Sequence, residues 1–92
     1  MTETKPKGIP PELLVKIRSE PWYEKCALTG RCPVQIHHHL RYQGRKLQEL
    51  FSLIPLHPDI HARVHEKEIR EKCDKIVWDR ATEEERKKYG LN

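Results

Sequence analysis

The stretch QIHHHLRYQGRKLQELFSLIPLHPDIHARVH, residues 35–65, decides the fold, because it holds every histidine of this 92-residue chain. The six are His37, His38, His39, His57, His61 and His65. The first three fall in VQIHHHL, residues 34–40, which predicts a strand from its β-branched residues and weak alternation. FSLIPL, residues 51–56, predicts a second short strand, which Pro55 confines to a sheet edge or a strand end.

The segments on either side of this stretch predict helices. Residues 10–20, PPELLVKIRSE, predict a short helix that begins at Pro11, since proline suits the first helical position. Residues 57–81 predict the main helical region, with a break near residues 66–68 and with Cys73 at a buried apolar position. Residues 82–90 predict a last helix, with a capping box between Thr82 and Glu85 and a stop at Gly90.

The remaining segments predict turns and loops. PWYEKCALTGRCP, residues 21–33, predicts a knuckle, and RYQGRKLQEL, residues 41–50, predicts a polar loop with a turn at Gly44 and a short helical piece after it. The order helix, β-hairpin, helix predicts a small α+β domain over residues 10–92, after a flexible leader at residues 1–9.

Composition limits the class of protein. Apolar residues make up 36% of the chain and charged residues 35%, so the core is small and a metal or a partner would help to stabilise it. No apolar run approaches the roughly 18 residues that span a bilayer, and the first residues lack the apolar segment of a secretion signal. We therefore expect a cytoplasmic protein with no membrane contact. Three cysteines, an odd number, argue against a disulfide framework.

The net charge of +4 is concentrated in the first part of the chain. Residues 1–56 contain nine Lys and Arg against five Asp and Glu, whereas residues 57–92 contain nine of each. A one-sided basic surface favours binding to the phosphate backbone of a nucleic acid, although solubilising charge alone would also account for it.

Spacing points to a metal site. His61 and His65 are four residues apart in a predicted helix, so their rings would project from the same face one turn apart and chelate a cation. Two histidines on a helix are more often solvated polar residues, but three more on the preceding strand make metal binding the better interpretation.

Three elements in order resemble the HNH endonuclease motif, the ββα-metal nuclease finger. HHL matches the consecutive pair that ends its first strand, SLIPLH matches its second strand, and HARVH matches its helical His-x-x-x-His. LLVKIRSEPWYEKCALTG also resembles the helix and knuckle that precede the motif in many phage and bacterial members. The resemblance covers Leu13 to His65 and implies a ββα core at about residues 33–66, followed by helices at about residues 67–90.

The resemblance also implies roles for individual residues. His38, His61 and His65 would hold one divalent cation, and His39 would be the general base that deprotonates the attacking water. The alternative register, with His37 and His38 as ligand and base, stays open.

One residue of the motif departs from the family pattern, and three basic residues lie between its strands. Ser52 occupies the position of the Asn that orients the base in the family, and it would do so more weakly. Arg41, Arg45 and Lys46, between the strands, would hold phosphates without reading sequence.

The activity implied is hydrolysis of DNA phosphodiester bonds with weak sequence specificity. Mn²⁺, Co²⁺, Ni²⁺ or Mg²⁺ would support cleavage, and Zn²⁺ would also bind, since imidazole nitrogens favour transition metals. A monomer with one site would nick duplex DNA, whereas a double-strand break would need a homodimer or two events.

Other functions stay open. Many family members hold a structural zinc in two Cys-x-x-Cys pairs, which here are Cys26 with Thr29 and His57 with Ile60. A complete site is therefore not expected, although Cys26, Cys32 and His57 leave a partial one with one position open. Separately, His37 and His57 are candidates for secondary metal ligands. A non-enzymatic zinc module that binds nucleic acid is the main alternative, and an inactive nuclease fold kept for protein interaction is another.

Overall fold

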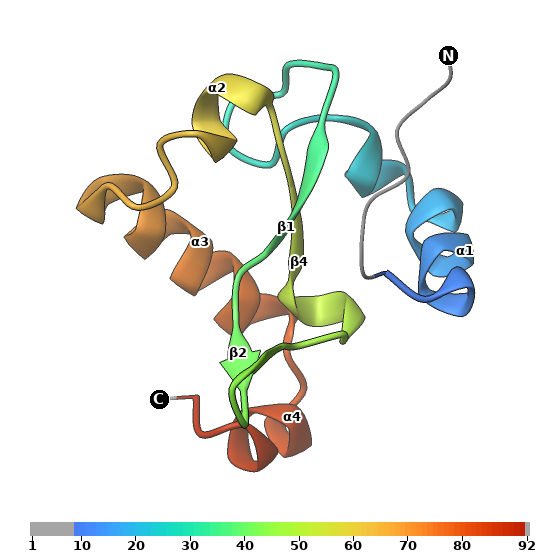
Figure 1. Cartoon of the computed structure of the whole chain (residues 1–92), viewed down its shortest axis with the longest axis vertical. Helices are drawn as coiled ribbons and strands as arrows, with labels where there is room; N and C mark the ends of the chain where they lie inside the picture. Colours follow the sequence, from blue (N-terminus) through green and yellow to red (C-terminus); the bar gives the residue numbers. More distant parts are fainter. Residues whose placement is uncertain (1–8, 92) are drawn as a thin grey trace.

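The computed structural model describes residues 9–91, in which helices surround two small antiparallel sheets in an α+β arrangement (Figure 1). The elements follow in the order α1 (Pro11–Ser19), the 3₁₀ helix η1 (Pro21–Glu24), β1 (Gln35–His38), β2 (Arg41–Tyr42), β3 (Arg45–Lys46), the 3₁₀ helix η2 (Leu50–Ser52), β4 (Leu53–Leu56), α2 (Pro58–His61), α3 (Lys67–Arg80) and α4 (Glu83–Lys88). No helix within the described part of the chain has the length and apolar character needed to cross a membrane.

The central feature is the antiparallel pair β1–β4, which Figure 1 shows between α1 on one side and α3 on the other. Ile54 packs in the core cluster of α3, and Leu53 in the cluster of α1. Because residues directly opposite in an antiparallel pair share a face, His37 opposite Ile54 faces α3, and His38 opposite Leu53 faces α1. The strand pairing thus sends consecutive histidines to opposite sides.

Two hydrophobic clusters meet at β4, whose four residues are all buried. The larger cluster joins the knuckle, β4 and α3, and includes Cys26, Leu56, Cys73 and Val77. The smaller one joins α1, η1 and β4, with Ile9 among its members. The burial predicted for Cys73 is confirmed. Most of the expected leader lies outside the described residues, but Ile9 is part of the core rather than of a flexible segment.

A β-hairpin replaces the polar loop expected at residues 41–50. β2 pairs with β3, and the two residues between them, Gln43 and Gly44, have φ angles of 53° and 79°. Positive φ at both central positions defines the tight turn whose twist matches a hairpin, and glycine adopts it without a steric cost. The turn at Gly44 is confirmed. The expected helical piece is η2, which also contains Phe51 and Ser52, two residues that were predicted to belong to the second strand.

The main helical region is interrupted earlier and for longer than expected. α2 begins at Pro58, and the ring Nδ1 of His57 accepts the N–H of Asp59 at 3.2 Å. It ends at His61, and α3 starts only at Lys67. Between them the backbone makes i→i+3 bonds, such as Val64 N–H to His61 O at 3.3 Å. The α-helical register from His61 to His65 is therefore not formed.

The remaining helix ends follow the local signals. Proline occupies the first turn of α1, and α4 has the full capping box between Thr82 and Glu85. After α4, Gly90 has a φ of 71° and the N–H of Leu91 bonds Arg86 O at 2.8 Å. This is the left-handed stop that glycine favours at a helix C-terminus.

Candidate functional site

Three imidazoles meet on the α3 side of β1. Nε2 of His37 lies 3.1 Å from Nδ1 of His39, and the ring centres of His37 and His61 are 5.2 Å apart. His37 and His39 share a face because side chains alternate along an extended strand, and α2 places His61 against them. We call His37, His39 and His61 the imidazole cluster.

Two polar side chains orient the imidazole cluster from outside. Nε2 of His39 lies 2.5 Å from Oδ1 of Asp74 on α3, and the His39 side chain is only 6% exposed. Nδ1 of His61 lies 2.7 Å from Oε1 of Gln35. A carboxylate or amide oxygen can only accept, so the neutral rings of His39 and His61 carry their protons on these nitrogens. The lone pairs then sit on Nε2 of His61 and on Nδ1 of His39, which accepts a hydrogen bond from Nε2 of His37 at 3.1 Å.

Sequence reasoning did not find Asp74. It lies 35 residues after His39, on a helix rich in charged residues, and no local spacing distinguishes it from Asp79 one turn later. Only the packing of α3 against β4 and η2 brings its carboxylate to the ring, which lies just after β1. The same packing gives the arrangement its chemical character, because a carboxylate bonded to one imidazole nitrogen fixes the tautomer and makes the other nitrogen a better base or ligand.

Burial keeps His37 and His61 neutral. It lowers the pKa of His37 to about 4, and the neighbouring rings of His39, His61 and His38 and the Lys46 ammonium add to the effect. Burial, followed by Lys46, also lowers the pKa of His61. A neutral imidazole is the form that binds a metal or accepts a proton, so these groups are available near pH 7.

The rings of His37 and His61 form an edge-to-face contact whose ring-centre separation matches that of two ligands on one divalent cation. A metal–nitrogen bond of about 2.0–2.1 Å puts each ring centre roughly 3.2 Å from the ion, and hence two tetrahedrally placed rings about 5 Å apart. The observed 5.2 Å agrees with this separation. Over residues 9–91, no three His, Cys, Asp or Glu side chains are arranged to hold a metal. A cation on this pair would complete its coordination with water or substrate oxygens.

His38 and Ser52 lie elsewhere than their expected roles require. Nε2 of His38 bonds Oε1 of Gln48 at 3.3 Å on the α1 side of the strand. Burial, the largest influence on this ring, lowers its pKa. The Ser52 hydroxyl is fully buried and bonds the carbonyls of Leu47 and Glu49 at 3.3 and 2.9 Å. Its link to His39 is through the backbone, where Ser52 O accepts the His39 N–H at 3.2 Å.

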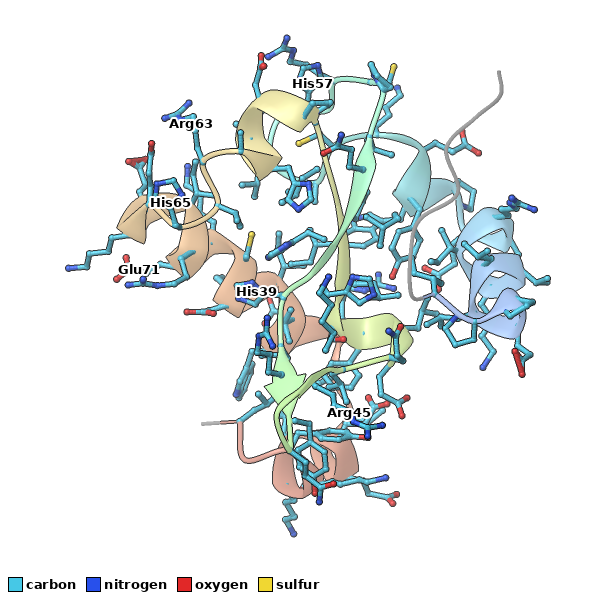
Figure 2. The ribbon with its side chains drawn as sticks, viewed as in Figure 1. His39, Arg45, His57, Arg63, His65 and Glu71 are labelled. Carbon is cyan, nitrogen blue, oxygen red and sulfur yellow. The ribbon has the colours of Figure 1, made fainter. Side chains whose placement is uncertain are left out.

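His65 is exposed in the segment after α2. Figure 2 shows it near the start of α3 and apart from His39. The expected pairing with His61 required one continuous helix, and α2 ends before that turn is made. The structure therefore brings His61, but not His65, to the imidazole cluster.

The knuckle around Cys26 is packed without a complete set of zinc ligands. Burial raises the pKa of the Cys26 thiol, but hydrogen bonds from Thr29 and from the backbone of His57, Leu28 and Thr29 outweigh it, so the pKa is lowered. Cys26 is buried and Cys32 exposed, and both are free. Ile60 packs against the larger core cluster, and the His57 ring caps α2.

The basic residues expected to hold phosphates lie on the hairpin beside the imidazole cluster. Arg41 and Lys46 are directly opposite each other in β2 and β3, and both are exposed, as is Arg45. Within residues 9–91, none of the three forms a salt bridge. Lys46 contributes to the lowered pKa of all of His37, His38 and His61, which places its charge next to these rings.

We found no match for this chain among protein-family models, curated proteins or solved structures. A function is therefore inferred from the residues themselves. They combine an imidazole oriented by a carboxylate, two neutral imidazoles 5.2 Å apart, and next to them Lys46, which forms no salt bridge within residues 9–91. This combination suits hydrolysis of a phosphate ester, which needs a base, charge neutralisation and phosphate binding.

Proposed function

We propose that the protein is a divalent-metal-dependent endonuclease of the HNH type that hydrolyses phosphodiester bonds in DNA. The observation that carries the proposal is the imidazole cluster, with Asp74 on His39 and the basic hairpin beside it. In this proposal β1, β4 and α2 are the two strands and the helix of the ββα-metal finger. The resemblance of the sequence to that motif supports the roles of His39 and His61, whereas His38, Ser52 and His65 do not take the places that it implies.

The roles follow from which nitrogens are free. His37 and His61 would hold the cation, which when bound supplies positive charge to the scissile phosphate and to the departing oxygen. Mn²⁺, Co²⁺, Ni²⁺ and Mg²⁺ are the ions expected to support cleavage, with Zn²⁺ also binding. Asp74 holds the proton of His39 on Nε2, so Nδ1 of His39 would be the general base once Nε2 of His37, now 3.1 Å from it, turns to the cation.

The hydrolytic step then balances with the residues present. A water oxygen forms a bond to phosphorus while Nδ1 of His39 takes its proton, and the bond from phosphorus to the 3′-oxygen breaks. The leaving oxygen receives a proton from solvent. Lys46, Arg41 and Arg45 hold the flanking phosphates, which positions the strand without reading its sequence. One such site cuts one strand, so nicking is the expected product.

The test is a plasmid-nicking assay on protein stripped with EDTA, to which single metals are returned. Supercoiled plasmid should become open circular only with metal, and His39→Ala and His61→Ala should each slow nicking by about 100-fold or more. His65→Ala is the matched control, and it should stay within about twofold of the wild type. Its loss of activity would show instead that α2 extends by a turn and returns His65 to the metal site.

Two outcomes would overturn the proposal: no nicking with any metal, or variants at His39 and His61 that nick like the wild type. Stoichiometric zinc in the purified protein, with unfolding on chelation, would favour the zinc-binding module instead. The nuclease proposal expects a fold that survives EDTA, because its two clusters of buried side chains do not depend on an ion.

A further inference from the structure

A small cavity of about 230 Å³ opens next to the His39–Asp74 pair. Its lining comes from the link between β1 and β2, from α3 and from the chain after α4: Leu40, Asp74, Val77, Trp78, Gly90 and Leu91. Asp74 thus takes part in both places, since Oδ1 contacts His39 and the side chain also borders the cavity. We call this space the Asp74 pocket.

We propose that the Asp74 pocket receives a single unstacked nucleobase of the DNA strand whose neighbouring phosphate lies at the imidazole cluster. This inference rests on the proposed nuclease function and specifies its substrate as single-stranded or locally unpaired DNA. The size of the pocket agrees with such a ligand. Sites for drug-sized molecules begin at about 300 Å³, so a smaller space suits one ring system.

The chemistry of the lining selects a base rather than a phosphate. Leu40, Val77 and Leu91 form apolar walls, and Trp78 adds an aromatic side chain that is 40% exposed. Bases stack on such side chains with little regard to sequence. The one charged group of the lining is the Asp74 carboxylate, which repels phosphate and accepts N–H groups from a base edge.

Trp78 is held in place from outside the pocket. The guanidinium carbon of Arg86 lies 3.6 Å from the centre of the indole ring, and Nε of Arg86 donates to the Trp78 carbonyl at 3.0 Å. A fixed aromatic surface loses little conformational entropy when a base packs on it. The Arg86 guanidinium also places a positive charge against Trp78, whereas the lining itself is apolar and acidic.

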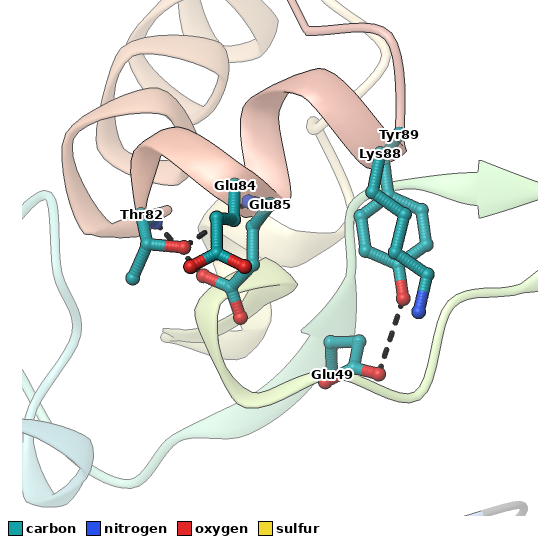
Figure 3. Close-up of a pocket in the computed structure, with 6 residues that line it drawn as sticks. All are labelled: Glu49, Thr82, Glu84, Glu85, Lys88 and Tyr89. Atoms are coloured by element: carbon teal, nitrogen blue, oxygen red, sulfur yellow. Dashed lines mark hydrogen bonds between the residues drawn. The ribbon is translucent and has the colours of Figure 1, made fainter.

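The path of the strand follows from the surrounding charges. Leu40 of the pocket directly precedes Arg41, which pairs with Lys46 on the hairpin, so phosphates held there place an adjoining nucleoside beside the pocket. A larger cavity of about 420 Å³ lies between Glu49 and α4, and Glu84 and Glu85 also line it. Figure 3 shows the side chains around it. Three carboxylates against one lysine, Lys88, make that cavity repel the backbone.

The experiment measures binding without cleavage, in EDTA, with a fluorescently labelled single-stranded oligodeoxynucleotide of 12 residues. One base is removed at each position in turn to give an abasic series. The wild type should lose roughly tenfold to a hundredfold in affinity at one position and little at the others. Trp78→Ala should bind the intact strand weaker by that factor and show no position dependence.

Two further variants separate the pocket from general folding effects. Trp78→Phe keeps an aromatic ring and should retain most of the position dependence, whereas Val15→Ala, at an exposed site on α1, should match the wild type. An even abasic series in the wild type, a persistent position dependence in Trp78→Ala, or no DNA binding would overturn the proposal. Absence of nicking would overturn the nuclease function alone, because this measurement needs neither metal nor turnover.

Discussion

Asp74→Asn is the substitution that separates orientation of His39 from stability of the fold. The carboxylate contacts Nε2 of His39 at 2.5 Å, and the ring is 6% exposed while Asp74 is 60% exposed. An asparagine keeps the size of the side chain but can present either oxygen or N–H to the ring. When it presents N–H, the proton of the neutral imidazole moves to Nδ1, and the proposed base loses its lone pair.

The magnitude follows from the type of contact that is lost. Hydrogen bonds to a charged group contribute about 1.5–3 kcal/mol, which corresponds to a decrease in kcat of roughly ten- to a hundredfold when the contact acts in the transition state. The effect on the free energy of unfolding is smaller, below about 1 kcal/mol, because water screens a carboxylate that is mostly exposed. Activity should therefore fall much more than stability.

The assay compares metal-dependent nicking rates with the midpoint of thermal unfolding. Asp79→Asn is the matched control: it makes the same substitution on α3 in a carboxylate that is 53% exposed and pairs with Lys75 at 3.4 Å. It should change neither quantity appreciably. Equal rates for the two variants, or a loss of rate in Asp74→Asn that only parallels its loss of folded protein, would refute the orienting role.

Two other predictions concern pH and salt. Lowering the pH from 7.5 to 5 in EDTA should reduce the free energy of unfolding, measured by urea denaturation, more in the wild type than in His37→Gln. The difference between the two reductions should reach up to about 2 kcal/mol. The reason is that burial lowers the pKa of His37 from 6.5 to about 4, so below pH 6.5 the unfolded chain binds a proton that the folded one does not. Equal reductions of the free energy of unfolding in the wild type and in His37→Gln would contradict this reasoning. Lys46→Ala should weaken DNA binding and reduce the slope of log affinity against log salt by about 0.7–0.9, as expected for one lost phosphate contact. Lys16→Ala on α1 should leave that slope unchanged, and an equal change in both would mean that the hairpin has no special part in binding.

Local chemistry in the sequence determined much of the framework. Pro11 at the start of α1, the box between Thr82 and Glu85 and the stop at Gly90 each depend on residues within one helical turn, so their positions could be predicted. The turn at Gly44 is local in the same way, although the strands that flank it became visible only in the structure. The α+β class follows from the same short-range patterns.

The candidate site was only partly contained in the sequence. The histidines and the basic residues were visible as residue types, but which rings meet depends on strand register and on where a helix stops. The pairing of His37 with Ile54 turns that ring toward α3, and the end of α2 at His61 leaves His65 outside.

Tertiary packing alone decided the partner of the proposed base and the pocket next to it. Asp74 reaches His39 across 35 residues of sequence, and Trp78 borders the same cavity because α3 lies against the link between β1 and β2. Such contacts have no sequence periodicity, since they arise when buried side chains such as Cys73 and Val77 fix the helix on the sheet. The sequence determined which chemical groups were available, and the packing of α3 determined which of them could act together.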